Sequence, residues 1–343
     1  MHKRLRAGVF AALLLAAVTM LAVAAAQSAT SKVTSIAIAA PEKGNDYGWN
    51  QQGVDSAKRA AKALGIGNVE VADGIGYENV EPVLRQLASK KPGLIIAQAS
   101  GFNTIAPRVA EQFKVPVLVY DNPKATKKGL VGDIETTSQQ GAYLAGILAG
   151  KLTKTGIIGV VISAADTNWY KQTGGYVAGA RSVNPDVQVK FAQIGQAAYA
   201  DAAGGKRVTQ SVIAAGADII FGMGDGSSFG MLQAVQTAKK SYKVWFIDVI
   251  GDKSKIDKKG VLLSSVIWDF TKVFKQAIFD INAGKFGTHG YNLGVNNGIY
   301  LLKTKHIPAD VWALTEAARK GIAAGNVKIP HTPDKKSVDK LLK

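Results

Sequence analysis

The chain has 343 residues, of which 47% are apolar and 20% are charged, and it contains 37 glycines and no cysteine. This composition excludes a disordered or fibrous protein and predicts a globular α/β protein that is long enough for two domains. The lack of cysteine excludes disulfides and thiol catalysis, and we expect no lipid anchor attached through a cysteine.

The formal net charge is +17. A net positive charge of this size can indicate nucleic-acid binding. The lysines, however, are spread along the chain in pairs and form no basic helix or aromatic-basic stripe. We therefore expect no nucleic-acid partner and interpret the charge as a solvated basic surface. Attraction to an anionic partner or ligand is the alternative.

Residues 1–26 have the features of a secretory signal peptide. Basic residues precede an apolar run over 7–23, and small residues lead to an expected cleavage site near Ala26. The alternative is a retained anchor, because the run approaches the roughly 20 residues that span a bilayer. The alanine-rich sequence favours cleavage and a periplasmic location. Removal of Lys3, Arg4 and Arg6 would lower the net charge from +17 to +14.

The first half of the remaining chain alternates strands and helices. Predicted strands cover 35–40, 69–72, 94–98, 115–120 and 130–132, and predicted helices cover 49–64, 80–89, 104–113 and 138–152. This alternation predicts right-handed crossovers and a parallel sheet that is buried on both faces.

The pattern pauses at 153–156 and then begins again. Strands are predicted over 157–162, 187–193, 219–221 and 244–249, and helices over 173–182, 202–215 and 228–239. A strand over 261–267, a helix over 270–283, an extended segment over 291–303 and a helix over 309–324 follow, and the polar residues 335–343 are expected to fray. Two similar halves in series are typical of a two-lobed binding protein.

The loop after the first strand, residues 41–53, is a candidate ligand site. It combines a carboxylate, two aromatic rings and a carboxamide: Asp46, Tyr47, Trp49 and Asn50. Ligands of open α/β sheets bind at the carboxyl ends of the strands, where such loops gather. The alternative is a helix start in which Asn45 or Asp46 caps the helix and Trp49 packs into the core.

Other motifs do not indicate catalysis. The glycine-rich loop 224–230 has the wrong spacing for a dinucleotide site, although we expect it to face the crevice. The four histidines lie beside no candidate nucleophile and in no metal-ligand spacing. Four carboxylates near strand ends could converge on a ligand: Asp46, Asp121, Asp225 and Asp252. We expect no catalytic residue, no metal and no cofactor.

Five aromatic residues fall at or just after predicted strand ends: Trp49, Trp169, Tyr170, Tyr199 and Trp268. We expect two or three of them to stack on a flat ligand, because core aromatic residues lie more often inside the periodic runs. Packing in the core or at the surface is the alternative for each.

Several motifs resemble those of one known family. Residues 46–51 resemble its D-x-x-[FW]-N-Q element, 141–146 its Y-L-A-G helix, 174–185 its G-F-x-x-G-x-x-x-x-N-P segment and 322–330 its closing I-x-x-G-x-I-x-V-P. The resemblance runs from about residue 36 to 330. By it the chain is identified as a member of the basic membrane protein family of ABC-transporter substrate-binding proteins, whose best-known members bind purine nucleosides.

The resemblance implies a type I periplasmic-binding-protein fold. In this α/β fold two Rossmann-like lobes with parallel sheets are joined by a hinge of three crossovers, which we expect at about Lys154, Gly260 and Gly290. The expected N-terminal lobe comprises 27–154 and 261–290, and the expected C-terminal lobe comprises 155–260 and 291–343.

The resemblance also implies a ligand site. Trp49 and Tyr199 match the two stacking rings of the family, and three further positions match polar contacts: Asp46, Asn50 and Asp121. Two positions depart from the nucleoside binders, since Ile250 stands where they have a carboxylate and Trp268 where they have a lysine. These residues would leave ribose hydroxyls poorly paired, so a free purine-like base fits the pattern as well as a nucleoside.

The implied function is that of the extracytoplasmic solute-binding component of an ABC importer. Its partners would be a small flat polar ligand and a permease in the inner membrane, and we expect a monomer. Three alternatives stay open: a ligand sensor for a membrane receptor, a sugar-binding protein, and a secreted nucleoside hydrolase.

Overall fold

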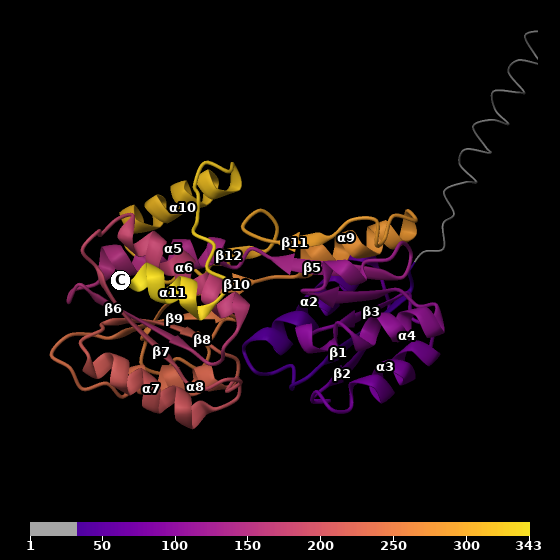
Figure 1. Cartoon of the computed structure of the whole chain (residues 1–343), viewed down its shortest axis with the longest axis horizontal. Helices are drawn as coiled ribbons and strands as arrows, with labels where there is room; N and C mark the ends of the chain where they lie inside the picture. The colour runs from indigo at the N-terminus through magenta and orange to yellow at the C-terminus, as the bar shows by residue number, and fades with distance from the viewer. Residues whose placement is uncertain (1–32) are drawn as a thin grey trace, which may run out of the picture.

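The computed structural model describes residues 33–343, and the predicted signal peptide, residues 1–26, lies outside this range. The described chain forms two six-stranded sheets, each covered by helices, which make two lobes side by side (Figure 1). This is the expected α/β architecture of two lobes with mostly parallel sheets. Within residues 33–343, no helix is both long and apolar enough to cross a membrane.

The first lobe has a fully parallel sheet in the strand order β11-β5-β4-β3-β1-β2. Its strands are β1 (Ser35–Ala40), β2 (Asn68–Asp73), β3 (Leu94–Ala97), β4 (Val117–Tyr120), β5 (Val131–Thr136) and β11 (Tyr291–Leu293). Its helices are α2 (Trp49–Leu64), α3 (Val80–Ser89), α4 (Ile105–Phe113) and α9 (Thr271–Asn282). Every residue of β3 and β4 is buried, because helices pack on both faces of the sheet.

The second lobe has the order β12-β10-β9-β8-β6-β7, in which only the edge strand β12 runs antiparallel to its neighbour. Its strands are β6 (Ile157–Ile162), β7 (Gln188–Gln193), β8 (Ile219–Met223), β9 (Trp245–Ile250), β10 (Leu262–Trp268) and β12 (Ile299–Leu301). Its helices are α5 (Gln139–Leu152), α6 (Thr167–Arg181), α7 (Ala202–Ala214), α8 (Ser227–Gln236), α10 (Ala309–Ala323) and α11 (Lys335–Leu342).

Helix α5 belongs to the second lobe, so the first crossover precedes it and does not lie at Lys154. The reason is its contact with α6, where glycines let the two backbones approach closely. A Cβ atom at Gly146 would lie 2.0 Å from the backbone oxygen of Tyr176, and one at Gly179 would lie 2.0 Å from that of Tyr143. The small residues of α5 therefore allow it to pack closely on α6, which is a helix of the second lobe.

The other two crossovers also differ from the expected positions. Strand β10 pairs in parallel with β9, so residues 262–268 lie in the second sheet and the chain returns to the first lobe only afterwards, not at Gly260. Strand β11 pairs with β5 of the first lobe and β12 with β10 of the second, which puts the third crossover between them, after Gly290.

Several ends of elements were predicted wrongly, among them the end of β5 and the end of α8, and two of the differences have a clear structural cause. Helix α6 begins at Thr167 and not at 173, because Asp166 accepts hydrogen bonds from the N–H groups of Asn168 and Trp169. Residues 335–342, which were expected to fray, form α11, whose Val338 is fully buried. Arg181 of α6 donates a hydrogen bond to the backbone oxygen of Leu341 and holds this helix on the second lobe.

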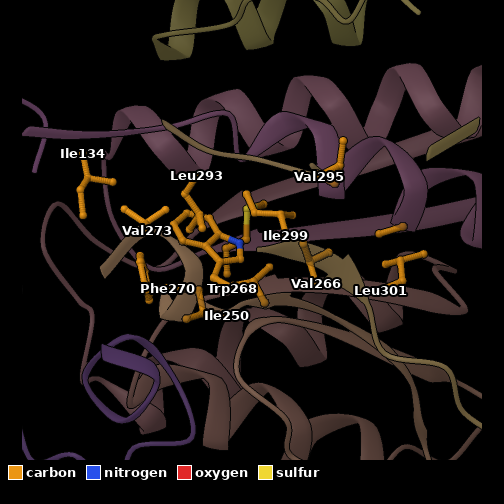
Figure 2. Packing of buried hydrophobic residues seen from close by; sticks show 14 of the residues in the cluster. Ile134, Ile250, Val266, Trp268, Phe270, Val273, Leu293, Val295, Ile299 and Leu301 are labelled. Carbon is orange, nitrogen blue, oxygen red and sulfur yellow. The ribbon is translucent and has the colours of Figure 1, made fainter. Parts of the chain in front are cut away.

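One apolar cluster continues from the first lobe through the crossovers into the second. Figure 2 shows Trp268, the last residue of β10, surrounded by Ile250, Phe270, Leu293 and Ile299. These residues come from strand ends and crossovers of both lobes, so the hinge region is packed like a core.

Candidate ligand-binding site

A cavity of about 480 Å³ lies between the two lobes. The first lobe lines it with Trp49, Tyr77, Ala99, Ser100 and Gly101, and the second lobe with Asp166, Asn168, Trp169, Ala197, Tyr199, Asp225, Ile250 and Trp268. Most of these residues follow the carboxyl ends of parallel strands, where α/β proteins bind ligands. The volume is that of a site for one small molecule.

Trp49 is the first residue of α2 and forms part of the wall from the first lobe. Its indole Nε1 donates a hydrogen bond of 2.7 Å to the backbone oxygen of Gln98. The ring meets those of Tyr120 and Phe270 edge to face, with centroids 4.9 and 5.3 Å away. These contacts hold the indole in one orientation, which a stacking ring requires.

The aromatic residues of the opposite wall are also held by hydrogen bonds. Trp169 Nε1 donates to the hydroxyl of Ser163 over 3.0 Å, and Tyr199 donates its hydroxyl proton to Asp166 over 3.0 Å. Burial and the neighbouring Asp166 carboxylate raise the pKa of Tyr199. The phenol therefore stays protonated and acts as a donor. Trp49, Trp169 and Tyr199, three of the aromatic residues that the sequence marks as candidate stacking residues, line one cavity.

Asp166 and Asn168 were missed from the sequence because the start of α6 was predicted too late. Asp166 caps this helix and orients Tyr199, while Asn168 accepts a hydrogen bond of 2.8 Å from the hydroxyl of Thr136 in the first lobe. An aspartate two residues before an asparagine and just after a buried strand is a capping signal that could have identified both.

Tyr77 and Ser100 were missed too. They follow β2 and β3, and Tyr77 packs edge to face on Phe102 with a centroid distance of 5.7 Å. A Cβ atom at Gly101 would lie 2.7 Å from the Tyr77 ring. This glycine therefore makes room for the tyrosine. No residue pattern in these short loops indicated a site, because only the sheet brings the loops together.

Asp46 and Asn50 do not line the cavity. Asp46 accepts hydrogen bonds from the backbone N–H groups of Gly48, Asn50 and Gln51 at 2.9, 3.1 and 3.0 Å, and from Asn50 Nδ2 at 2.8 Å. Asn50 Oδ1 accepts from the N–H of Glu42. Asp46 therefore accepts backbone N–H groups at the start of α2, as the helix-start alternative expected, and together with Asn50 it shapes the loop that carries Trp49.

Asp121 and Asp252 also lie outside the cavity lining. Asp121 follows β4 in a left-handed conformation (φ 55°) and accepts a hydrogen bond of 2.5 Å from Ser100, so it supports a lining residue. Burial and the Asp166 carboxylate raise the pKa of Asp121. Asp252 is exposed and accepts from Ser254 within its own turn.

Asp225 is the predicted carboxylate that does line the cavity. Its Oδ1 lies 3.4 Å from the backbone nitrogen of Trp49, which donates to it across the two lobes. Burial, and after it the carboxylates of Asp46 and Glu42, raise the pKa of Asp225 well above its usual range. No cationic side chain pairs with Asp225 within residues 33–343.

The two residues that depart from the nucleoside binders both reach the cavity. Ile250 ends β9 with a left-handed backbone (φ 69°), and Trp268 ends the neighbouring strand β10. Both are almost fully buried. Trp268 Nε1 has no hydrogen-bond partner among the described residues. Among residues 33–343, this side of the cavity therefore offers apolar surface and no charged group, and its one unpaired polar atom is the indole N–H of Trp268.

Comparison with known proteins identifies the family. Residues 33–330 match the model of ABC transporter substrate-binding proteins like PnrA. The nucleoside-binding protein BmpA of an ABC transporter from Lactococcus lactis is 32% identical over 210 residues, which cover 56% of this chain and 58% of that protein. The transcriptional activator protein med of Bacillus subtilis is 23% identical over 278 residues, which cover 80% of this chain and 83% of that protein.

A solved structure shares the fold. The solute-binding protein of an ABC transporter system from Conexibacter woesei aligns with a TM-score of 0.72 and 22% identity, over 87% of this chain and 99% of that one. The match to BmpA spans less than two thirds of that relative's length. The family model, however, covers most of the chain. The chain therefore belongs to the basic membrane protein family of ABC-transporter substrate-binding proteins.

Proposed function

We propose that the protein is the extracytoplasmic solute-binding component of an ABC importer and that it captures a small flat polar ligand between its lobes. The observation that carries this proposal is the cavity itself, which both lobes line and to which both contribute aromatic side chains. Hinge closure would bury the ligand and create the surface that a permease in the inner membrane recognises.

The ligand we propose is a purine nucleoside or a free purine-like base. Trp49 and Tyr199 supply rings from opposite lobes, and Asp225 supplies a polar acceptor. Ile250 and Trp268 make one side of the cavity apolar. Ribose hydroxyls on that side would lose hydrogen bonds to water without replacement, which favours the free base.

A thermal-shift screen tests this function. The protein expressed from Gln27 onward and refolded to remove carried-over ligand would be screened against nucleosides, free bases and simple sugars. A binder at about a hundredfold its dissociation constant should add roughly 2.7 kcal/mol of stability. A shift with purines supports the proposal, whereas a shift with sugars alone, or none, overturns it. Release of free base from a nucleoside during the incubation would instead indicate a hydrolase.

Variants connect the binding to the cavity. Trp49→Ala and Tyr199→Ala should each weaken purine binding, because each removes one face of the stack. Trp245→Ala is the matched control, since Trp245 begins β9 at the end of the strand remote from the cavity and packs on Lys243 and His306. Equal affinities in all three variants would contradict the assignment of the site.

A sensor function is the second candidate. One relative, the med protein, is named a transcriptional activator and its match covers 80% of this chain, which favours a regulatory role as the alternative to transport. Uptake of labelled purine by cells, with and without the gene for this protein, separates the two functions. An importer component is required for uptake, whereas a sensor is not.

A further inference from the structure

The charge of the cavity is opposite to that of the whole protein. The chain carries a net charge of +17, yet the residues that line the cavity include two carboxylates and no lysine, arginine or histidine. On a protein with this net charge, a surface region chosen at random would contain more basic than acidic side chains. The acidic lining of the cavity therefore does not follow from the net charge of the protein. We relate it to the charge of the ligand.

The two carboxylates differ in how much of their hydrogen-bonding capacity is used. Asp166 accepts from the N–H groups of Asn168 and Trp169 through one oxygen and from Tyr199 through the other. Asp225 accepts only the 3.4 Å bond from Trp49 through Oδ1. Its Oδ2 has no partner within residues 33–343 and is available to a ligand.

The surroundings of Asp225 add negative charge. A Cβ atom at Gly48 would lie 3.2 Å from Asp225 Oδ1 and 3.5 Å from Asp46 Oδ2, so both carboxylates lie against the same backbone segment. Glu42 and Asp46 also raise the pKa of Asp225. Burial, Asp225, Glu42 and Asp166 together raise the pKa of the cavity residue Tyr77 to about 12.

The nearest buried cation does not neutralise this site. Lys253 Nζ lies 2.5 Å from Asp248 Oδ2 and donates to the backbone oxygen of Tyr47, so its charge is already paired. Lys253 lowers the pKa of Asp225, but burial and the two carboxylates of the first lobe outweigh it. Asp225 is partly buried and has no cationic partner within residues 33–343. A cationic ligand would supply that partner and would favour the ionised form of the Asp225 side chain.

The aromatic lining suits such a ligand. Trp49, Trp169, Tyr199 and Trp268 contribute ring surfaces to the same cavity. Tryptophan and tyrosine faces attract cations, most strongly where water is excluded. We propose that the cavity selects flat nitrogen heterocycles or amidines that carry a positive charge, with Asp225 as their counter-ion. This inference rests on the proposed function and concerns the charge of the ligand: among flat nitrogen heterocycles, the cavity would favour those that are cationic over neutral ones.

Three probes of equal shape but different charge test the proposal. Benzamidinium is positive, benzamide is neutral and benzoate is negative, and each is flat and small enough for the cavity. Their affinities for the refolded full-length mature protein would be measured by calorimetry at pH 7. We expect benzamidinium to bind about tenfold or more tightly than benzamide, and benzoate to bind most weakly.

Two variants assign the charge preference to one residue. Asp225→Asn should reduce the preference for benzamidinium over benzamide to near unity, because it keeps the shape and removes the charge. Asp252→Asn removes the same charge from an exposed turn of the same lobe and should keep the preference. Equal changes in both variants would overturn the role of Asp225.

The remaining outcomes are decisive as well. Equal affinity for benzamidinium and benzamide, a preference for benzoate, or no binding of any of the three probes overturns charge selection. If neutral purines still stabilise the protein in that case, the proposed function stands and only this inference fails. If neither purines nor benzamidinium bind, both fail.

Discussion

Lys253 of the second lobe donates a hydrogen bond from Nζ to the backbone oxygen of Tyr47 in the first lobe, over 3.0 Å. Lys253 is fully buried and also pairs with Asp248 at 2.5 Å. Tyr47 has a left-handed backbone (φ 51°) at the turn before α2. The backbone of Gly251 lies against the same carbonyl, since a Cβ atom on this glycine would be only 1.9 Å from the Tyr47 oxygen. Lys253 thus bonds one carbonyl of the first lobe and Gly251 packs closely against it, contacts that exist only while the lobes are together.

Replacement of Lys253 by methionine should affect both stability and binding. Lys253→Met leaves the buried Asp248 carboxylate unpaired, which should cost about 3–5 kcal/mol in the free energy of unfolding. The double variant Lys253→Met/Asp248→Leu should recover most of that loss, because an apolar pair can replace a buried ion pair. It should still bind purine about tenfold to a hundredfold more weakly, since the charged donor to Tyr47 is absent. Urea unfolding and calorimetry measure the two effects, and full recovery of affinity would show that the contact with Tyr47 does not stabilise closure.

Gly251→Ala should impair closure and leave folding intact. The new methyl group meets a carbonyl of the other lobe, and the lobes can relieve the clash by moving apart. We expect loss of the ligand-induced thermal shift with a change in ligand-free stability of less than about 1 kcal/mol. Small-angle scattering with and without ligand would detect the open form. A variant that still contracts with ligand would contradict this account.

Gly146→Ala should instead destabilise the fold. Its methyl group would meet the backbone oxygen of Tyr176 within the same lobe, and neither helix can yield without losing its packing. We expect a loss of about 1–3 kcal/mol in the free energy of unfolding. Gly290→Ala is the control, since nothing lies within 4 Å of a Cβ atom there. Similar stabilities of the two variants would disprove the close contact of α5 and α6.

Asp46→Ala distinguishes a capping role from ligand contact. Asp46 accepts three backbone N–H bonds at the start of α2, and their loss should cost about 1–2 kcal/mol in stability. Asp55→Ala, farther along the same helix, should stay within about 0.5 kcal/mol of the wild type. Purine affinity of Asp46→Ala, measured at a temperature where it is fully folded, should change little. A loss of affinity without a loss of stability would indicate direct contact with the ligand.

The raised pKa of Asp225 predicts a pH dependence of ligand-free stability. The folded protein holds this proton more tightly than the unfolded chain, whose aspartates have a pKa of about 3.9. The free energy of unfolding should therefore fall as the pH rises above about 4, until the folded-state pKa is passed. Asp225→Asn lacks this contribution, so its melting temperature should rise relative to wild type between pH 4 and 7. Parallel pH profiles of the two proteins would contradict the shift.

The sequence by itself determined the secondary structure and the family. The strand over 35–40 and the helices over 49–64 and 80–89 have the predicted bounds, because apolar periodicity and flanking glycines are local properties. Five residues predicted from the sequence as ligand contacts line the cavity, since each lies at or after a strand end of a parallel sheet: Trp49, Trp169, Tyr199, Asp225 and Trp268.

Only the tertiary structure decided the lobe to which each segment belongs. The sequences of helix α5 and strand β10 do not indicate which lobe they belong to. Their contacts with α6 and β9 place both in the second lobe. The same holds for the carboxylates. Asp46 and Asp225 both lie in glycine-rich loops after strands. Asp46, however, accepts hydrogen bonds from backbone N–H groups, whereas Asp225 lines the cavity. A side chain's role depends on neighbours that are distant in sequence, and local pattern carries no information about them.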